Sequence, residues 1–156
     1  MNVRRAKACD MERINELLLD VAALHNSGRP DIFKESAKKY TDEELLSIIE
    51  NDKTPVFVAE NDTGYVLGYV FCIYKETRDS ILLHDMKTLY IDDLCVDKTA
   101  RGKKVGTALY EFALSEAKKN GCYNLTLNVW HLNGGAMKFY EKCGMSPLKT
   151  VMEKIL

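Results

Sequence analysis

The stretch that most constrains the fold of this chain runs from Leu94 to Leu109 and reads LCVDKTARGKKVGTAL. An apolar strand is expected to end at Val96, and a polar loop then leads to Gly106, where helical spacing begins. The first N–H groups of a helix have no intrahelical partner, so we expect amides from about Lys103 to Thr107 to be free to bind an anion. The spacing matches neither G-x-G-x-x-G nor G-x-x-x-x-G-K-[ST], which excludes the usual dinucleotide and P-loop interpretations.

Length and composition indicate a soluble protein built as a single domain, residues 1–156. Hydrophobic residues make up 46% of the chain and charged residues 29%, and no apolar run approaches the roughly 20 residues of a membrane span. The N-terminal segment lacks the apolar core of a signal peptide, so we expect a cytoplasmic protein and no membrane partner. The net charge of −1 provides no general field for nucleic acid.

Cysteine and histidine usage gives no sign of a metal site. The five cysteines are odd in number and widely spaced, and we expect them to be reduced. The three histidines share no i, i+4 spacing and lie close to no cysteine, so no metal is expected.

Hydrophobic periodicity predicts the element order β-α-α-β-β-β-α-β-α-β. Strands are expected at 2–6, 55–60, 65–74, 86–96, 125–129 and 148–155. Helices are expected after Asp10, from Thr41 in a capping box with Glu44, from Val105, and after Asn133. A βαβ crossover after Asp92 implies one parallel pair. The fold class is therefore α/β (α+β), with a mixed, mostly antiparallel central sheet and helices on both faces.

Two motifs in this order carry a resemblance to a known family. Residues 101–106, RGKKVG, follow a strand and resemble the R/Q-x-x-G-x-G/A motif of the GNAT superfamily of acyl-CoA N-acyltransferases. Residues 133–144, NGGAMKFYEKCG, resemble that family's second signature, N-x-x-A-x-x-x-Y-x-x-x-G. Together with the element order, the resemblance covers essentially the whole chain. It implies a GNAT-like fold and an N-acetyltransferase that uses acetyl-CoA as co-substrate and no metal.

The resemblance also implies which residues bind the co-substrate. The backbone of Leu94, Cys95 and Val96 would pair with the pantetheine arm. The pyrophosphate would lie against a loop and helix start formed by Arg101, Gly102, Lys103, Lys104, Val105, Gly106 and Thr107. Lys104 stands where the family usually has its first glycine, and a lysine there costs about 1 kcal/mol if the position needs a positive φ. The alternative is a charged loop that merely starts a helix.

Asn133 and Tyr140 are seven residues apart, close to two helical turns, so both can face one groove. The resemblance implies that Tyr140 protonates the departing CoA thiolate and that Asn133 belongs to the co-substrate site. Full proton transfer from an ordinary tyrosine to an ordinary thiolate is uphill by about 2 kcal/mol, which is small beside the barriers that enzymes lower. The alternatives are a packed aromatic at Tyr140 and a plain helix cap at Asn133, and the cap is compatible with a ligand contact.

An acidic pair, Asp92 and Asp93, precedes the predicted pantetheine strand. An alkyl amine with a pKa of about 10.4 is almost fully protonated at neutral pH, so a base near the acceptor nitrogen is useful. Successive strand residues point to opposite faces, so we expect one acid to face the substrate. The pair resembles that of the diamine acetyltransferases of the superfamily, which implies Asp92 as a base acting through a water and Asp93 as a charge that orients a cationic substrate. Alternatively, both acids are solvated or paired with lysine or arginine.

The sequence is compatible with three hypotheses on function. The first is an N-acetyltransferase in which an amine attacks the thioester directly. A covalent intermediate on Cys95 is an alternative mechanism for this enzyme, although no base lies near Cys95 in the sequence. The second is a non-catalytic acyl-CoA-binding module. The third, nucleic-acid binding through the loop cations, is weakened by the net charge and by the absence of interleaved aromatics.

The sequence does not name the acceptor. A small-molecule amine and a peptide amine present the same nucleophile, and acyl chain length is equally open. The loop between the first two helices is expected to form the acceptor side, with His25 or Tyr40 as candidates and with Trp130 and His131 bordering the cleft. Loops of this composition are also common as plain surface. Exposed sheet edges or the C-terminal strand would support a homodimer.

Overall fold

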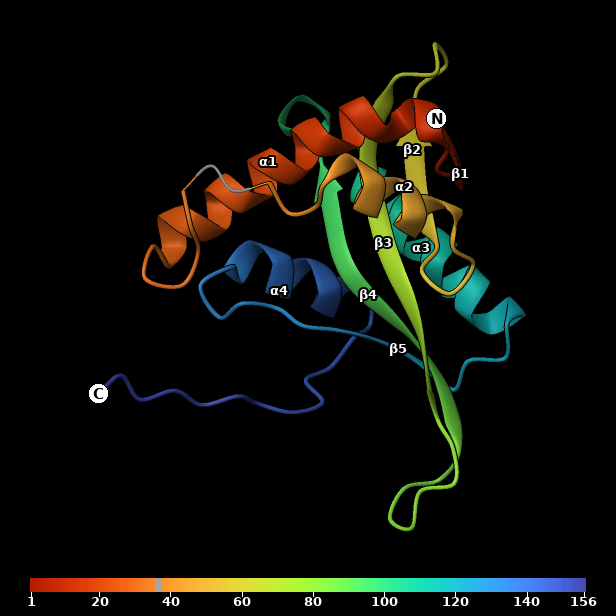
Figure 1. The fold of residues 1–156 in the computed structure, drawn as a ribbon, viewed down its shortest axis with the longest axis vertical. Coiled ribbons are helices and arrows are strands. Elements are labelled where there is room, and N and C mark those ends of the chain that lie inside the picture. The colour runs from red at the N-terminus through yellow and green to blue at the C-terminus, as the bar shows by residue number, and fades with distance from the viewer. Residues whose placement is uncertain (36–37) are drawn as a thin grey trace.

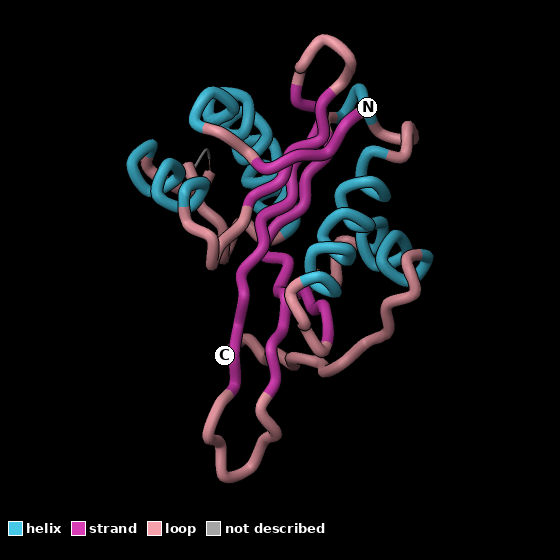
Figure 2. Tube along the Cα trace, turned by 90° about the vertical axis from the view of Figure 1, so that its right-hand side faces the viewer, coloured by secondary structure: helices cyan, strands magenta, loops and turns pink. Residues whose placement is uncertain are grey.

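The computed structural model describes residues 1–35 and 38–156, and in these residues a five-stranded sheet lies between helices (Figures 1 and 2). The strands follow one another in the sheet as β1 (Asn2–Arg5), β2 (Val56–Glu60), β3 (Val66–Thr77), β4 (Met86–Val96) and β5 (Asn124–Leu127). The first four pair antiparallel, and β5 is parallel to β4. The helices are α1 (Met11–Gly28), α2 (Asp42–Glu50), α3 (Val105–Lys119) and α4 (Gly134–Lys142), with 3-10 turns η1 (Ala8–Asp10) and η2 (Lys98–Ala100). The predicted mixed, mostly antiparallel sheet with helices on both faces is confirmed.

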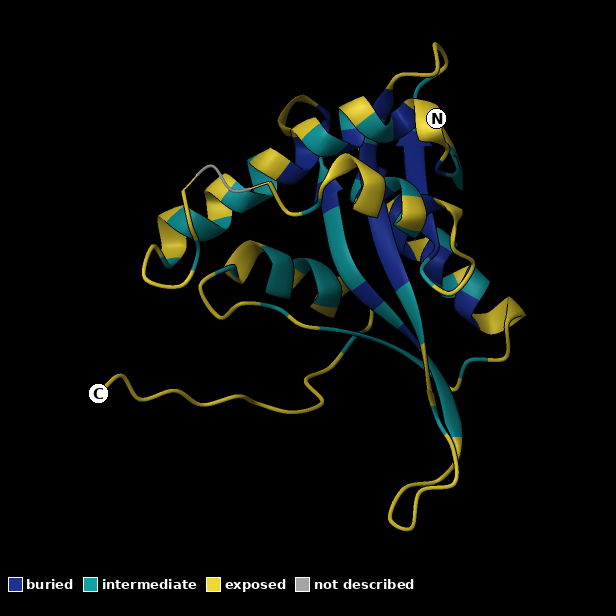
Figure 3. Cartoon of the chain, in the orientation of Figure 1, coloured by how far each residue is buried: buried dark blue, intermediate teal, exposed yellow. Residues whose placement is uncertain are grey.

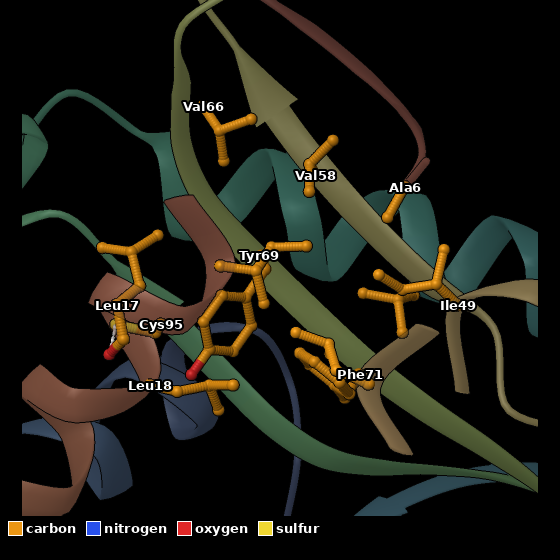
Figure 4. Packing of buried hydrophobic residues seen from close by; sticks show 12 residues of the cluster. Ala6, Leu17, Leu18, Ile49, Val58, Val66, Tyr69, Phe71 and Cys95 are labelled. Atoms are coloured by element: carbon orange, nitrogen blue, oxygen red, sulfur yellow. Dashed lines mark hydrogen bonds between the residues drawn. The ribbon is translucent and has the colours of Figure 1, made fainter. Parts of the chain in front are cut away.

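The central strand β3 divides the core into two layers, because its side chains alternate between the faces of the sheet. Tyr69 and Phe71 pack against α1 and α2, as Figure 4 shows for Tyr69 beside Leu17 and Leu18. Val70 packs against α3 on the opposite face. Both faces are covered, which explains why β3 reads as a nearly continuous apolar run.

Local sequence signals explain where several elements begin. Thr41 caps α2 as predicted: its Oγ1 accepts the Glu44 N–H at 3.2 Å, and the Glu44 carboxylate accepts the Thr41 N–H at 2.8 Å. Asp10 lies at the start of α1 as expected, but its carboxylate does not cap that helix. It accepts two hydrogen bonds from the Arg4 guanidinium instead, at 2.7 and 3.0 Å, and ties β1 to η1.

The predicted final strand at 148–155 is wrong. Residues 146–156 follow α4 in an extended path, pair with no strand of the described residues, and are exposed throughout (Figures 1 and 3). Glu153 contacts the body of the molecule through Arg29, with oxygen–nitrogen distances of 2.8 and 2.9 Å. Alternating apolar residues indicate a strand only where a neighbouring strand supplies a ladder, and within the described chain β5 is paired with β4 alone.

Strand β4 contains an irregularity in its centre that shapes the site. Phe71 is opposite Asp93 and Cys72 is opposite Ile91, so Asp92 is an extra residue in a β-bulge. On its other edge, β4 pairs with β5 only from Thr88 to Ile91. Residues 92–96 of β4 therefore have an edge that β5 does not cover.

Among the described residues, no helix is long and apolar enough to cross a membrane.

Candidate active site

The backbone groups of residues 92–96 in β4 are not paired with β5. Leu94 and Val96 pack their side chains into the core on the α3 side, whereas Cys95 packs on the α1 side. The three residues that were predicted to pair with a pantetheine arm can therefore offer it N–H and C=O groups, as an exposed strand edge does.

Cys95 has the properties of a core residue and not of a nucleophile. Its side chain lies within the core cluster beneath α1, with Sγ 3.8 Å from the Leu17 carbonyl oxygen. Burial raises the pKa of the Cys95 thiol to about 12. Because the thiolate is the reactive form, this environment argues against the covalent mechanism through Cys95.

The start of α3 lies directly after the open edge of β4. The first hydrogen bond of the helix runs from the Ala108 N–H to the Lys104 carbonyl at 3.0 Å, so the amides of Val105 to Thr107 have no partner within the helix. The prediction of a free Lys103 amide is wrong, because this N–H donates to the Ala100 carbonyl at 3.3 Å. The loop cations Arg101, Lys103 and Lys104 are exposed, whereas the Val105 side chain is buried in the core.

Lys104 adopts a left-handed conformation, with a φ of 64° and a ψ of 15°. This is the position where a glycine was expected from the motif, and the structure shows the strain that a side chain incurs there. Gly102, two residues earlier, also has a positive φ, of 77°. The loop therefore makes its turn with one glycine and one strained lysine.

Replacing Lys104 by glycine is expected to raise the free energy of unfolding by about 1 kcal/mol, because the strain of the left-handed backbone is relieved. The measurement is denaturant unfolding. Lys103→Gly is the matched control: it removes the same charge from a position without positive φ and should lower stability. Equal effects of the two variants would contradict the assignment of strain to Lys104.

Helix α4 carries the second motif along one wall of the site. Asn133 caps α4, because its Oδ1 accepts the Ala136 N–H at 3.0 Å, and this cap is compatible with a ligand contact. The ring of Tyr140 packs against Phe139 and Tyr110, with centroid distances of 5.0 and 6.3 Å. Burial, followed by the negative charge of Asp93, raises the pKa of Tyr140. Tyr140 is thus held as the neutral phenol, and complete release of its proton costs more than it would from an exposed tyrosine.

The two acids of β4 lie on one side of the strand, and the prediction that they point to opposite faces is wrong. Lys39 Nζ lies 3.0 Å from Asp92 Oδ2 and 3.6 Å from Asp93 Oδ2. The bulge at Asp92 breaks the alternation of side chains, so neighbouring carboxylates converge on one ammonium group. Tyr40 donates a hydrogen bond to Asp92 at 3.4 Å, and Tyr69 donates one to Asp93 at 3.2 Å. The salt-bridged alternative for the pair is therefore what the structure shows.

The electrostatics of this cluster follow from burial and charge. Burial raises the pKa of Asp93, although Lys39 and the Tyr69 hydroxyl oppose the effect. Burial alone would lower the pKa of Lys39, but the negative charges of Asp93 and Asp92 outweigh it, and the pKa is raised. The cluster is a pair of carboxylates arranged around a cation.

A cluster of aromatic side chains lies between the end of α1 and the start of α4. The His25 ring stacks on Phe33 at 4.9 Å, and Phe33 meets Trp130 edge-on at 5.1 Å. These three residues, with Leu132 and Asn133, line part of a cavity of about 210 Å³. His25 and Trp130, both candidates from the sequence, thus come together, whereas His131 lies exposed next to them.

Sequence reasoning missed two residues of this region, Lys39 and Tyr69. Lys39 is 53 residues from Asp92, and no pattern links a lysine in a loop to an acid in a distant strand. Tyr69 has the pattern of an ordinary core aromatic, and its contact with Asp93 follows from the register of β3 with β4, in which Phe71 is opposite Asp93 and Tyr69 is opposite Cys95. Strand pairing between β3 and β4 was the signal that could have found Tyr69.

Comparisons with known proteins show the family to which the chain belongs. Residues 18–145 match the model of the Acetyltransferase (GNAT) family. This match places the chain in the class of acyltransferases. The chain belongs to the GNAT family and is an N-acetyltransferase.

Two named relatives act on one kind of acceptor. The chain is 31% identical over 120 residues to a glucosamine 6-phosphate N-acetyltransferase of Arabidopsis thaliana, covering 77% of this chain and 70% of that protein. It is 35% identical over 91 residues to the protein of the same name from Candida albicans. This match covers 56% of this chain and 55% of that protein.

Solved structures show the same fold. A mutant of the BH1408 protein from Bacillus halodurans superposes with a TM-score of 0.96 at 29% identity, covering 100% of this chain and 99% of that one. The glucosamine-6-phosphate N-acetyltransferase of Arabidopsis thaliana superposes with a TM-score of 0.72 at 27% identity, covering 99% and 97%.

Proposed function

We propose that residues 1–156 act as one domain that transfers the acetyl group of acetyl-CoA to a primary amine, by direct attack of the amine in a ternary complex. The observation that carries the proposal is the cluster at the β4 bulge. Two carboxylates there hold an ammonium group, next to a strand edge that is free to pair with a ligand. In this proposal the acceptor amine would bind beside the acyl donor.

The co-substrate would bind through backbone groups and a few cations. Its pantetheine arm would pair with the edge formed by Leu94, Cys95 and Val96. Its pyrophosphate would accept hydrogen bonds from the amides of Val105, Gly106 and Thr107, where the helix dipole favours an anion. Arg101, Gly102, Lys103 and Lys104 complete the loop, which adds three positive charges. Asn133 would hold the start of α4 against the arm.

The chemistry would divide among three side chains. Asp92 is the better placed base, because its side chain is 28% exposed whereas that of Asp93 is 12% exposed. Asp93 would fix the acceptor amine by charge. The bulge leaves a residue of β4 without a ladder partner, and its N–H would stabilise the oxyanion of the tetrahedral intermediate. Tyr140 would hydrogen-bond to the leaving sulfur and give it a proton.

The acceptor to test first is glucosamine 6-phosphate, because two relatives of this chain carry that name. A hexosamine is also compatible with the rings of His25, Phe33 and Trp130, which offer flat apolar faces along part of a cavity. Peptide amines remain the second class of acceptor.

The test is release of free CoA thiol from acetyl-CoA in the presence of glucosamine 6-phosphate, diamines and peptides with a free N-terminus. Turnover with one acceptor, lost in Asp92→Asn while acetyl-CoA still binds, supports the proposal. Binding of acetyl-CoA without turnover on any acceptor would favour a non-catalytic acyl-CoA-binding module. Failure to bind acetyl-CoA would overturn both.

A further inference from the structure

The ammonium group of Lys39 occupies the position where an acceptor amine is needed. Its Nζ lies 3.0 and 3.6 Å from the two carboxylates that would bind and deprotonate an acceptor. Lys39 comes from the segment before α2 and reaches across to the bulge of β4, 53 residues away in sequence.

We propose that Lys39 is itself an acetyl acceptor, and that the chain acetylates this lysine when acetyl-CoA is bound and no other amine fills the site. This inference rests on the proposed function and extends it to a modification site. Three features of the structure make the reaction feasible: the carboxylates hold Nζ at the bulge, the adjacent β4 edge is open, and the Lys39 side chain keeps 38% of its surface exposed.

The reaction balances without a further reagent. Asp92 takes one proton from the Lys39 ammonium, and the neutral Nζ attacks the thioester carbon. A C–N bond forms, the C–S bond breaks, and Tyr140 protonates the departing sulfur. A second proton leaves nitrogen as the amide forms and restores the Tyr140 hydroxyl, while Asp92 passes its proton to solvent. The products are Nε-acetyl-lysine, free CoA and one proton released to solvent.

The surroundings of Lys39 predict that its acetylation is slow and takes place once per chain. The carboxylates that position the ammonium group also stabilise its charge, so little of the reactive neutral amine is present at any time. Acetylation then removes the positive charge that offsets the repulsion between the carboxylates of Asp92 and Asp93. The modified site would contain two acids without their cation, and a cationic acceptor would bind it more tightly than the unmodified one.

The experiment is to incubate the purified chain with acetyl-CoA alone, then measure intact mass and locate any acetyl group by peptide mass spectrometry. We expect one acetyl group per chain, on Lys39. The rate of acetylation should be independent of protein concentration, because donor and acceptor belong to one complex.

Lys39→Arg should abolish the adduct, and Tyr140→Phe should slow its formation at least about tenfold. Lys38→Arg is the matched control, since Lys38 pairs with Asp42 and not with the acids of β4, and should leave the adduct unchanged.

A parallel incubation with acetyl-CoA and glucosamine 6-phosphate separates this inference from the proposed function. An acceptor that turns over should protect Lys39 in proportion to its occupancy. Turnover on the acceptor with no adduct on Lys39 in either incubation would overturn the inference and leave the function intact. Acetyl groups spread over exposed lysines, with no excess on Lys39, would overturn it as chemical acetylation. No adduct and no turnover would count against both.

Discussion

Replacing Tyr140 by phenylalanine is expected to lower kcat about 100- to 10,000-fold, the range over which a positioned acid acts, while the dissociation constant of acetyl-CoA changes by less than about threefold. The substitution keeps the ring that packs on Phe139 and Tyr110 and removes only the hydroxyl group. The thiolate would then leave without a proton donor. The measurements are steady-state turnover and acetyl-CoA binding by calorimetry.

The matched control for Tyr140→Phe is Tyr123→Phe, because Tyr123 is 77% exposed and precedes β5 outside the site. It should keep full activity. A Tyr140→Phe enzyme with turnover within about threefold of the unmodified chain would show that Tyr140 is a packed aromatic and that sulfur is protonated by another route.

Replacing Gly68 by alanine should lower the free energy of unfolding by about 3 kcal/mol, the upper part of the usual range for overpacking. A Cβ at Gly68 would lie 2.5 Å from the Cys95 carbonyl oxygen and 3.2 Å from the Val96 Cα. Both are backbone atoms, so no change of rotamer relieves the clash, and β3 and β4 must move apart. The movement displaces the edge that is proposed to bind the pantetheine arm, and acetyl-CoA affinity should fall as well.

Denaturant unfolding and acetyl-CoA binding check this result. Gly135→Ala is the control, because a Cβ there would meet only the Asn133 Oδ1, at 3.8 Å, and alanine suits a helix. That variant should be as stable as the unmodified chain or slightly more stable. Loss of less than about 0.5 kcal/mol in Gly68→Ala would mean that the two strands separate more easily than their close packing indicates.

Features that depend on neighbouring residues could be predicted from the sequence. The Thr41 capping box, the extent of β4 and the cap at Asn133 follow from local chemistry and are confirmed. The strain at Lys104 was also visible, because the motif requires glycine where lysine stands. The element order, apart from the last strand, and the motifs were together sufficient to recognise the family.

Features that depend on distant pairing could not be predicted in the same way. The regular alternation of a strand placed Asp92 and Asp93 on opposite faces, but a bulge is determined by the register with β3 and is not visible in either strand alone. Lys39 meets these acids only because the chain folds α1 and α2 over the same face of the sheet. The strand expected at 148–155 has the right residues but no partner within the described chain.

The early end of β5 has a consequence for how fast a ligand can enter. Residues 92–96 of β4 have no strand neighbour on that side within the described part of the chain, so no ladder has to be broken to admit an extended arm. Such an arm would add to the sheet as a further strand does, and its entry would be limited by diffusion and orientation instead of by an opening step. An association rate that is linear in acetyl-CoA concentration, without saturation, is the kinetic signature expected of such an unpaired strand edge.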